Sequence, residues 1–191
     1  MCIVDADPNK STTFWHGIRP DDGKRVDVYH VPKGGDLVKT VNSVSRKYEI
    51  VVIDCPPAIE KLTSAAVAKS DLSIIPVATT GGSDIWATKE FLEHLQLLRA
   101  RLNAALPSYF VINKYEKNIK LHQAYMQVIG EYCEDYSVKQ LNSYFAKRTA
   151  YGEANAQGLG VLEWENAKAK KEVMALGKEI TTILKTKPQE V

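Results

Sequence analysis

The stretch YEIVVIDCPPAIEKLTSAAVAKSDLSIIPV, residues 48–77, holds two short apolar runs on either side of a segment that favours a helix. Residues 48–54 are rich in Val and Ile and predict a strand that ends before Pro56. Residues 60–69 predict a helix, and residues 71–77 predict the next strand. Neither apolar run alternates cleanly with polar residues, so both strands are expected in a parallel sheet that helices cover on both faces.

The same alternation continues on both sides of this stretch. Strands are predicted at 2–5, 26–31, 108–113 and 138–141, and helices at 36–46, 84–103, 119–133, 145–157 and 167–185. We therefore predict one α/β domain over residues 1–185, with a doubly wound, mainly parallel sheet, and a frayed tail at 186–191. In this architecture a ligand binds at the carboxyl ends of the strands.

Composition narrows the class of protein. The 191 residues include 45% hydrophobic and 25% charged residues, and the net charge is +2, so binding to nucleic acid would need a local basic patch. Three scattered cysteines and four scattered histidines predict neither a disulfide framework nor a transition-metal centre built by the protein. No apolar run has the length of a membrane span, and no signal-peptide pattern is present, so we expect a cytoplasmic protein without a membrane partner.

Three aspartates follow strand residues. Asp5 and Asp7 come at the end of the first predicted strand, and Asp54 ends the strand at 48–54. Such an acid is costly to desolvate unless a cation or hydrogen-bond donors receive it. One acid could hold Mg²⁺ through water, and a second could orient the attacking water in phosphoryl transfer. For a single aspartate, capping of the next turn is the simpler interpretation, but the three together favour a site.

Four segments resemble ParA-type partition ATPases, in the same order along the chain. DADPNKSTTFW (5–15) resembles their switch I segment, although Asn9 replaces the usual Gln. Residues 48–77 resemble their Walker B strand, switch II and the following strand. A later strand of these proteins, which helps to hold adenine, is similar to FVINKYEK (110–117). The segment before their last helix is similar to KRTAYGEANAQGLGVLEWE (147–165). The chain therefore resembles the ParA/MinD class of P-loop NTPases.

The resemblance implies roles for individual residues. Asp7 matches the catalytic aspartate that positions the hydrolytic water, and Asp5 and Asp54 match acids near the magnesium. Ser11 and Thr12 match positions near the metal or the γ-phosphate, and Asn113 matches an adenine contact.

The resemblance also implies a cycle. ATP with Mg²⁺ would support a homodimer that binds DNA without sequence preference on the nucleoid. Slow hydrolysis, stimulated by a ParB-like centromere-binding protein, would release the dimer, so that plasmid or chromosomal DNA is segregated.

The family's phosphate-binding loop, of the form KGGxGKT, is expected before the strand that ends at Asp5, and the 191 residues contain no such match. PKGGDLVKT (32–40) has KGG and KT, but the spacing is wrong and Asp36 would face phosphates. By resemblance, the missing strand would lie centrally, beside the strand at 48–54. The sequence could be a truncated reading of a longer gene or a degenerate paralogue, or another polypeptide could complete the sheet. We expect these residues to bind ATP weakly and hydrolyse it poorly.

The last predicted helix carries a lysine stripe. Lys168, Lys171, Lys178 and Lys185 lie on roughly one side, opposite an apolar face that includes Val173 and Ile180. The stripe could contact DNA phosphates, or it could be an ordinary solvated face, since Glu172 and Glu179 lie beside it.

Two other functions remain open. One is a pseudo-ATPase that acts as an interaction protein without hydrolysis. The other is a MinD-like positioning ATPase. It is ranked lower because the last helix lacks the bulky aromatic or leucine-rich apolar face, with a basic border, that a membrane anchor needs. Trp15 and Trp86 are expected to be packing residues.

Overall fold

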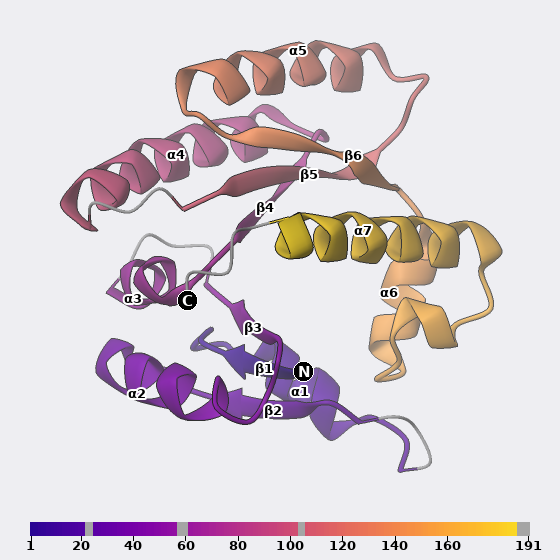
Figure 1. The fold of residues 1–191 in the computed structure, drawn as a ribbon. Coiled ribbons are helices and arrows are strands. Elements are labelled where there is room, and N and C mark those ends of the chain that lie inside the picture. The colour runs from indigo at the N-terminus through magenta and orange to yellow at the C-terminus, as the bar shows by residue number, and fades with distance from the viewer. Residues whose placement is uncertain (22–24, 57–60, 103–105, 187–191) are drawn as a thin grey trace.

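The computed structural model describes residues 1–21, 25–56, 61–102 and 106–186, and in these ranges strands and helices alternate (Figure 1). The strands are β1 (Cys2–Asp5), β2 (Asp27–His30), β3 (Val51–Asp54), β4 (Ser73–Ala78), β5 (Ser108–Tyr115) and β6 (Lys139–Ala146). The helices are α1 (Ser11–Gly17), α2 (Gly34–Val44), α3 (Lys61–Lys69), α4 (Gly82–Leu102), α5 (Lys120–Asp135), α6 (Thr149–Ala156) and α7 (Ala167–Thr186). A 3-10 turn, η1 (Val161–Glu163), precedes α7.

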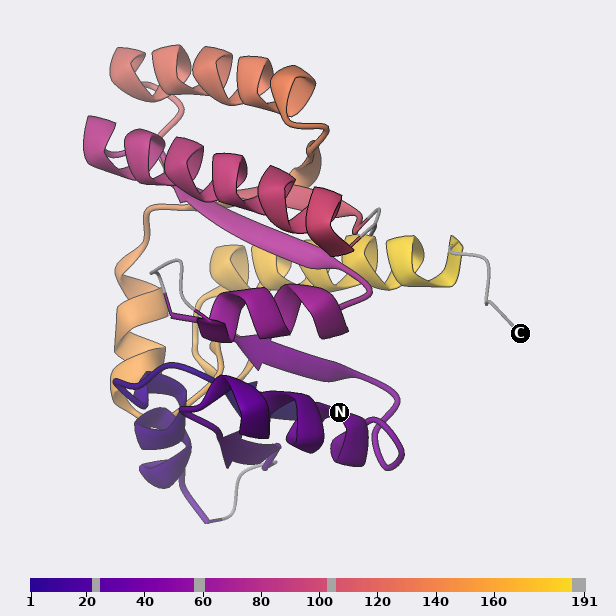
Figure 2. The same ribbon diagram turned by 90° about the vertical axis from the view of Figure 1, so that its left-hand side faces the viewer.

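The strands form two sheets of three, in the orders β2-β1-β3 and β4-β5-β6. The pairs β1–β2, β1–β3, β4–β5 and β5–β6 are all parallel. Figure 2 shows α2, α3 and α4 along one face of the sheets and α7 on the opposite face. The predicted α/β fold, with a parallel sheet between helices, is confirmed.

Each sheet has its own apolar core. Val4 and Leu37 are fully buried between the β1 sheet and α2. Leu92, Phe110 and Ile129 are fully buried around β5, between α4 and α5. The two clusters meet near α3, where Ala66 belongs to the first and the next residue, Val67, to the second. The fold is therefore two half-sheets, each with its own core, and β3 and β4 are the strands at which the halves meet.

Three elements differ from the sequence analysis. Residues 11–17 form helix α1, which the sequence analysis did not predict, and Asp5 accepts hydrogen bonds from Thr13 that fix its first turn. Strand β6 continues to Ala146, so the helix predicted from 145 begins at Thr149 instead. In the expected frayed tail, 187–191 lie outside the described residues, and Thr186 belongs to α7.

Trp86 is not a packing residue as expected, since its side chain is 73% exposed near the start of α4. Its neighbour Ile85 takes the core-facing position of that turn. Across the described ranges, no helix combines the length and apolar character needed to cross a membrane.

Candidate functional site

The ends of β1 and β3 bring two of the predicted acids side by side. Asp5 and Asp54 are register partners across the parallel β1–β3 ladder. Both strands run into loops at the same sheet edge, as expected for the ligand edge of a parallel sheet.

Asp5 is fully buried, and its carboxylate holds the start of α1. One oxygen, Oδ2, accepts hydrogen bonds from the Thr13 hydroxyl at 2.5 Å and from the Thr13 N–H at 2.9 Å. The other oxygen accepts from the Asp7 N–H at 3.1 Å. These donors compensate the cost of burying the carboxylate, so Asp5 acts as a structural cap inside the fold.

Asp54 has a more open position. Its Oδ2 accepts a 2.6 Å hydrogen bond from the hydroxyl of Thr12, which lies on the first turn of α1. Helix α1 is therefore tied to both strand ends, through Thr13 to β1 and through Thr12 to β3. A ligand that binds Asp54 would compete with this hydrogen bond and could therefore release the Thr12 end of α1 from β3.

Asp7 lies in the loop between β1 and α1. Its Oδ1 accepts from the Asn9 N–H at 2.9 Å, and its carbonyl accepts from the Lys10 N–H at 3.0 Å. Lys10 closes this turn with φ at 58°, an uncommon conformation for a residue with a side chain. Asp7 is half-buried, and Ser11, another predicted site residue, is exposed beside it.

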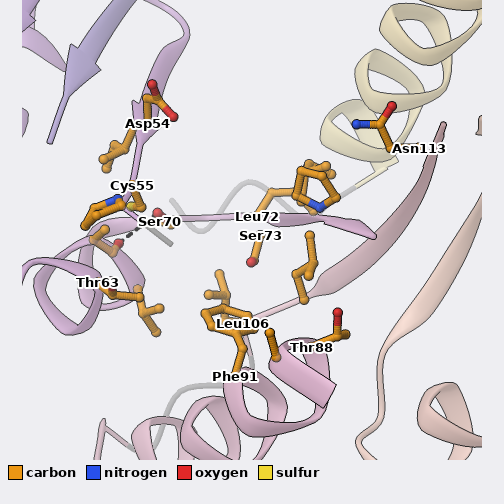
Figure 3. A pocket seen from close by; sticks show the side chains of 18 of the residues that line it. Asp54, Cys55, Thr63, Ser70, Leu72, Ser73, Thr88, Phe91, Leu106 and Asn113 are labelled. Atoms are coloured by element: carbon orange, nitrogen blue, oxygen red, sulfur yellow. Dashed lines mark hydrogen bonds between the residues drawn. The ribbon is translucent and has the colours of Figure 1, made fainter. Parts of the chain in front are cut away.

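A cavity of about 550 Å³ opens between the two half-sheets (Figure 3). Asp54 and Cys55 line it from the end of β3, and Asn113 lines it from β5. Figure 3 shows Asp54 and Asn113 at opposite sides of this space. The structure thus places a predicted metal residue and the predicted adenine residue at one cavity, although they are far apart in sequence.

Burial raises the pKa of the Cys55 thiol to about 11, with a smaller contribution from the charge of Asp54. The thiol is therefore protonated at neutral pH and is a poor nucleophile. Cys55 contributes to the wall of the cavity and not to its chemistry.

The residues present fit part of a Mg²⁺–ATP site. Asp54, with Thr12 beside it, fits a magnesium held through water, because the carboxylate lines an open space at a strand end. Asp5 fits such a role less well, since both of its oxygens already accept hydrogen bonds inside the fold. The glycines of PKGGDLVKT form the first turn of α2, whose Leu37 is buried, so this stretch is a packed helix start.

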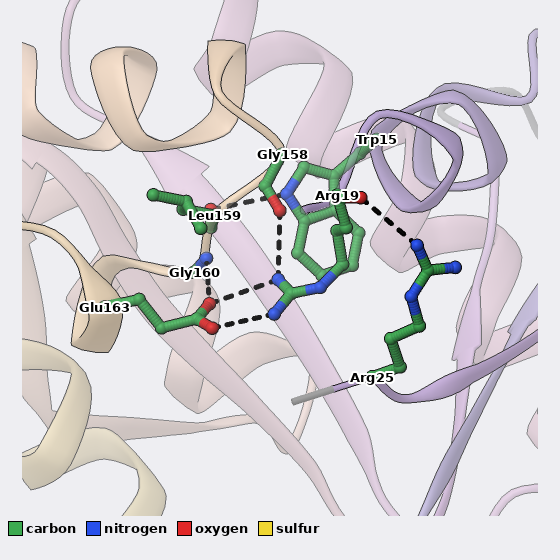
Figure 4. Close-up of polar contacts among 7 residues, drawn as sticks. All are labelled: Trp15, Arg19, Arg25, Gly158, Leu159, Gly160 and Glu163. Carbon is green, nitrogen blue, oxygen red and sulfur yellow. Dashed lines mark hydrogen bonds and ion pairs between the residues drawn. The ribbon is translucent and has the colours of Figure 1, made fainter. Parts of the chain in front are cut away.

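The other end of α1 is clamped to the segment before α7 (Figure 4). The Arg19 guanidinium donates to both oxygens of Glu163, at 2.7 and 3.1 Å, and to the Gly158 carbonyl at 3.0 Å. It also lies over the Trp15 ring, 5.0 Å from the centroid, and the Trp15 indole donates to the Leu159 carbonyl. The Arg19 side chain is 3% exposed and the Glu163 side chain is 34% exposed, so water reaches this ion pair only from the Glu163 side.

The four predicted lysines of α7 are all exposed. Glu172 and Glu179 point the other way, because they accept hydrogen bonds from β6 or the residues beside it. Glu172 binds the Ala146 N–H, Arg148 and Tyr151, and Glu179 binds the N–H groups of Asn142 and Ser143. Since these carboxylates are engaged with the fold, they dilute the outward charge of the lysines less than the sequence predicts.

A family model described as an AAA domain matches residues 31–108. The Maintenance of carboxysome distribution protein A of Halothiobacillus neapolitanus is 26% identical over 164 residues, which are 84% of this chain and 72% of that protein. A putative plasmid partition protein of Borrelia burgdorferi, solved with AMPPNP, has a TM-score of 0.66 at 19% identity, over 95% of this chain and 86% of that one. The expected resemblance to ParA/MinD-type proteins is confirmed.

A second ParA/MinD-type structure shows the same fold. The septum site-determining protein MinD of Pyrococcus horikoshii, complexed with Mg-ADP, has a TM-score of 0.68 at 15% identity and covers 98% of this chain and 86% of its own. The ParA/MinD-type neighbours are thus partition and positioning proteins, and two of them were solved with a nucleotide.

Sequence reasoning missed three residues that shape this site. Thr13 was available as part of the hydroxyl run after the acids, but nothing local assigns it to Asp5. Arg19 and Gly158 are 139 residues apart, so no spacing pattern could connect them.

Proposed function

We propose that this chain is the nucleotide-binding domain of a ParA/MinD-type partition or positioning ATPase. The observation that carries the proposal is the joint placement of Asp54 and Asn113 on one cavity, with α1 hydrogen-bonded to Asp54. Nucleotide-bound neighbours of the same fold support ATP and Mg²⁺ as the ligands.

In this proposal each described residue has a limited task. Magnesium would neutralise phosphate charge, and Asp54 would orient a water bound to the magnesium. The hydrogen bond from Thr12 to Asp54 would couple the occupancy of this site to the position of α1. Asp7 would orient the attacking water, Ser11 would approach the γ-phosphate, and Asn113 would contact adenine. Asp5 would fix the loop that carries Asp7.

The exposed lysines of α7 would bind DNA phosphates without sequence preference in a nucleotide-dependent homodimer, which a ParB-like partner would release. The cargo is either DNA or, by similarity to the carboxysome distribution protein, a carboxysome. Because residues 1–191 contain no KGGxGKT loop, we infer that they alone hold nucleotide weakly. A pseudo-ATPase that binds DNA or a homologue without nucleotide remains the second candidate for the same reason.

Salt-dependent DNA binding tests the α7 surface. We expect alanine at Lys168, Lys171, Lys178 and Lys185 to weaken binding and to reduce the slope of log K against log salt by about 0.9 for each phosphate that a lysine no longer neutralises. The matched control replaces four exposed lysines elsewhere, Lys33, Lys39, Lys47 and Lys69, and should leave the slope unchanged. An equal effect of both sets would show that net charge, and not α7, governs binding.

Titration with a fluorescent ATP analogue and Mg²⁺ tests the nucleotide site. Asp54→Asn should weaken the magnesium-dependent part of binding at least about tenfold, whereas Asp135→Asn, at the exposed end of α5, should not. DNA binding that is unaffected by nucleotide would favour the pseudo-ATPase. ATP hydrolysis at a rate typical of partition ATPases, abolished by Asp7→Ala, would contradict the inference of weak binding.

A further inference from the structure

Helix α1 connects the candidate ligand site to a segment that is far away in the sequence. At its first turn, the Thr12 hydroxyl donates to Asp54 at 2.6 Å. At its other end, the chain passes directly into Arg19, whose N–H donates to the His16 carbonyl at 3.4 Å. Because α1 has only seven residues, a length of about 10 Å, a displacement of its first turn also displaces Arg19.

Arg19 is held tightly by residues 158–163 (Figure 4). We call Arg19, Gly158 and Glu163 the clamp, because Arg19 donates to the Gly158 carbonyl and to both Glu163 oxygens. One of these oxygens also accepts from the Gly160 N–H at 2.7 Å. The two backbones touch as well, since a Cβ on Gly158 would lie 2.8 Å from the Arg19 nitrogen. Packed contacts of this kind shift between discrete arrangements, so α1 and the clamp are expected to move as one unit.

Residues 158–163 continue into α7 through a run of short-range hydrogen bonds. The Trp164 N–H donates to the Val161 carbonyl at 3.2 Å, and the Asn166 N–H donates to the Trp164 carbonyl at 3.0 Å. The Asn166 side chain then accepts from the Ala169 N–H at 2.9 Å, in the first turn of α7. The clamp and the start of α7 are thus joined by a short, hydrogen-bonded connection.

The later turns of α7 are anchored elsewhere. Glu172 and Glu179 accept hydrogen bonds from the backbone of β6 and hold these turns to that strand. A displacement that arrives through the clamp therefore acts on the residues before Glu172. The later lysines of the stripe follow this anchor, whereas Lys168 and Lys171 precede it.

We propose that α1 and the clamp couple the state of Asp54 to the first turn of α7. When a ligand takes the place of the Thr12 hydroxyl on Asp54, α1 is released from β3, the clamp shifts with it, and Lys168 and Lys171 change position. Ligand and DNA then alter each other's affinity by the same factor, because coupling between two sites is reciprocal. The inference rests on the proposed function for these two ligands, but the coupling within the chain is measurable without either of them.

Residue-resolved amide hydrogen exchange of the full chain tests the coupling in the absence of ligand. Thr12→Val removes the hydroxyl that binds Asp54 and keeps a β-branched side chain of similar shape. Exchange should then accelerate at least about threefold at the amides of Gly160, Glu163 and Ala169, which report the clamp and the first turn of α7.

Two controls separate this coupling from a general loosening of the fold. Thr80→Val removes a different Thr–Asp hydrogen bond, to Asp84 at the start of α4, and should leave the three reporter amides unchanged. In both variants the amides of Asn142 and Ser143, which Glu179 binds, should keep their wild-type rates and show that the variants are folded.

A second variant tests the coupling in the opposite direction. Glu163→Gln weakens the ion pair with Arg19 and should accelerate exchange of the Thr13 amide, at the other end of α1, at least about threefold. When Glu163→Gln is combined with Thr12→Val, the accelerations at Thr13 should not multiply, because both changes release the same unit.

The same measurement with Mg²⁺ and AMPPNP distinguishes the coupling from the proposed function. Changed exchange at Thr13 together with Gly160 and Ala169 would support both. A change at Thr13 without one at Gly160 and Ala169 would overturn the coupling and leave the nucleotide site in place. If nucleotide changes none of these amides, the proposed nucleotide site is contradicted, and the variants alone decide the coupling.

Two results from the variants would overturn the coupling whatever the nucleotide does. The first is wild-type exchange at Gly160, Glu163 and Ala169 in Thr12→Val, which would show that the first turn of α1 and the clamp are independent. The second is a set of accelerations that multiply at Thr13 in the double variant.

Discussion

Glu172 anchors α7 to the rest of the molecule through three donors. Burial acts to raise its pKa, but hydrogen bonds from Arg148, Tyr151 and the Ala146 N–H outweigh burial and hold the pKa below its ordinary value. A carboxylate with a lowered folded-state pKa contributes stability that is complete above the unfolded value of about 4.3 and is lost as the pH falls through the folded value.

We therefore expect Glu172→Gln to lower the free energy of unfolding by about 1.5–3 kcal/mol at neutral pH, the range for hydrogen bonds to charged groups. The difference from the wild type should begin to shrink as the pH falls below the unfolded value of about 4.3, and it should approach zero only below the lowered folded pKa, where the wild-type carboxylate is protonated. Urea unfolding at several pH values measures it. The exposed Glu165→Gln is the control and should change stability by less than about 0.5 kcal/mol at any pH.

At the residue scale, the sequence predicted that Asp5 and Asp54 lie at strand ends, but it could not predict which of them is structural and which lines the cavity. Asp5 and Asp54 both follow apolar strands, yet Asp5 is buried under Thr13 and Asp54 lines an open cavity. Helix α1 contacts both acids, and Arg19, which follows it, is held by Gly158 and Glu163 far along the chain, so no local pattern shows these contacts.

The attachment of α1 to the segment before α7 depends on a glycine. Gly158 has φ at +67°, and a Cβ there would lie 2.8 Å from the Arg19 nitrogen and the Ile18 carbonyl carbon. We expect Gly158→Ala to cost more than about 2 kcal/mol, since it combines a strained backbone with a backbone clash.

The matched control is Gly130→Ala, because Gly130 lies inside α5 with open space around it. Alanine there should stabilise the protein by about 0.5–1 kcal/mol through helix propensity. Thermal unfolding of both variants measures the contrast, and a destabilisation of similar size in both would contradict the close approach of α1 to residue 158.

At the element scale, the long periodic segments were predictable and the short ones were not. Helix α7 and helix α4 follow their apolar spacing almost to the residue. Helix α1 has only seven residues, two of them β-branched, and depends on Asp5 for its first turn. Strand β6 extends beyond its predicted end because Glu179 and Glu172 of α7 bind its backbone, which no local pattern shows.

The whole molecule has two cores, one for each half-sheet. Since β3 and β4 share no ladder in the described ranges, few backbone bonds oblige the halves to unfold together. We expect native-state hydrogen exchange to give opening free energies that differ by at least about 1 kcal/mol between β1 and β5, with β5 the more stable because more buried side chains surround it. A single opening free energy for both strands, measured in low denaturant, would show that the halves unfold as one unit.

The order of strands and helices at this scale follows from the sequence, because alternation of apolar strands and helices leaves few topologies. That the sheet divides beside β3 was predicted only from the resemblance to a known family, and not from the residues themselves. Pairing partners in a parallel sheet are distant in sequence, so nothing in residues 51–54 or 73–78 alone shows that one edge lacks a neighbour.

Pro76 affects how readily the edge of β4 can pair with a like strand. An open edge of Val and Ile residues is a template for lateral growth into aggregates, because two like edges can join by a full row of backbone bonds. A proline in the middle of β4 interrupts that row, so self-templated growth from this edge loses a central bond at every step. Pro76 therefore lowers the number of backbone bonds that β4 can offer to a like strand.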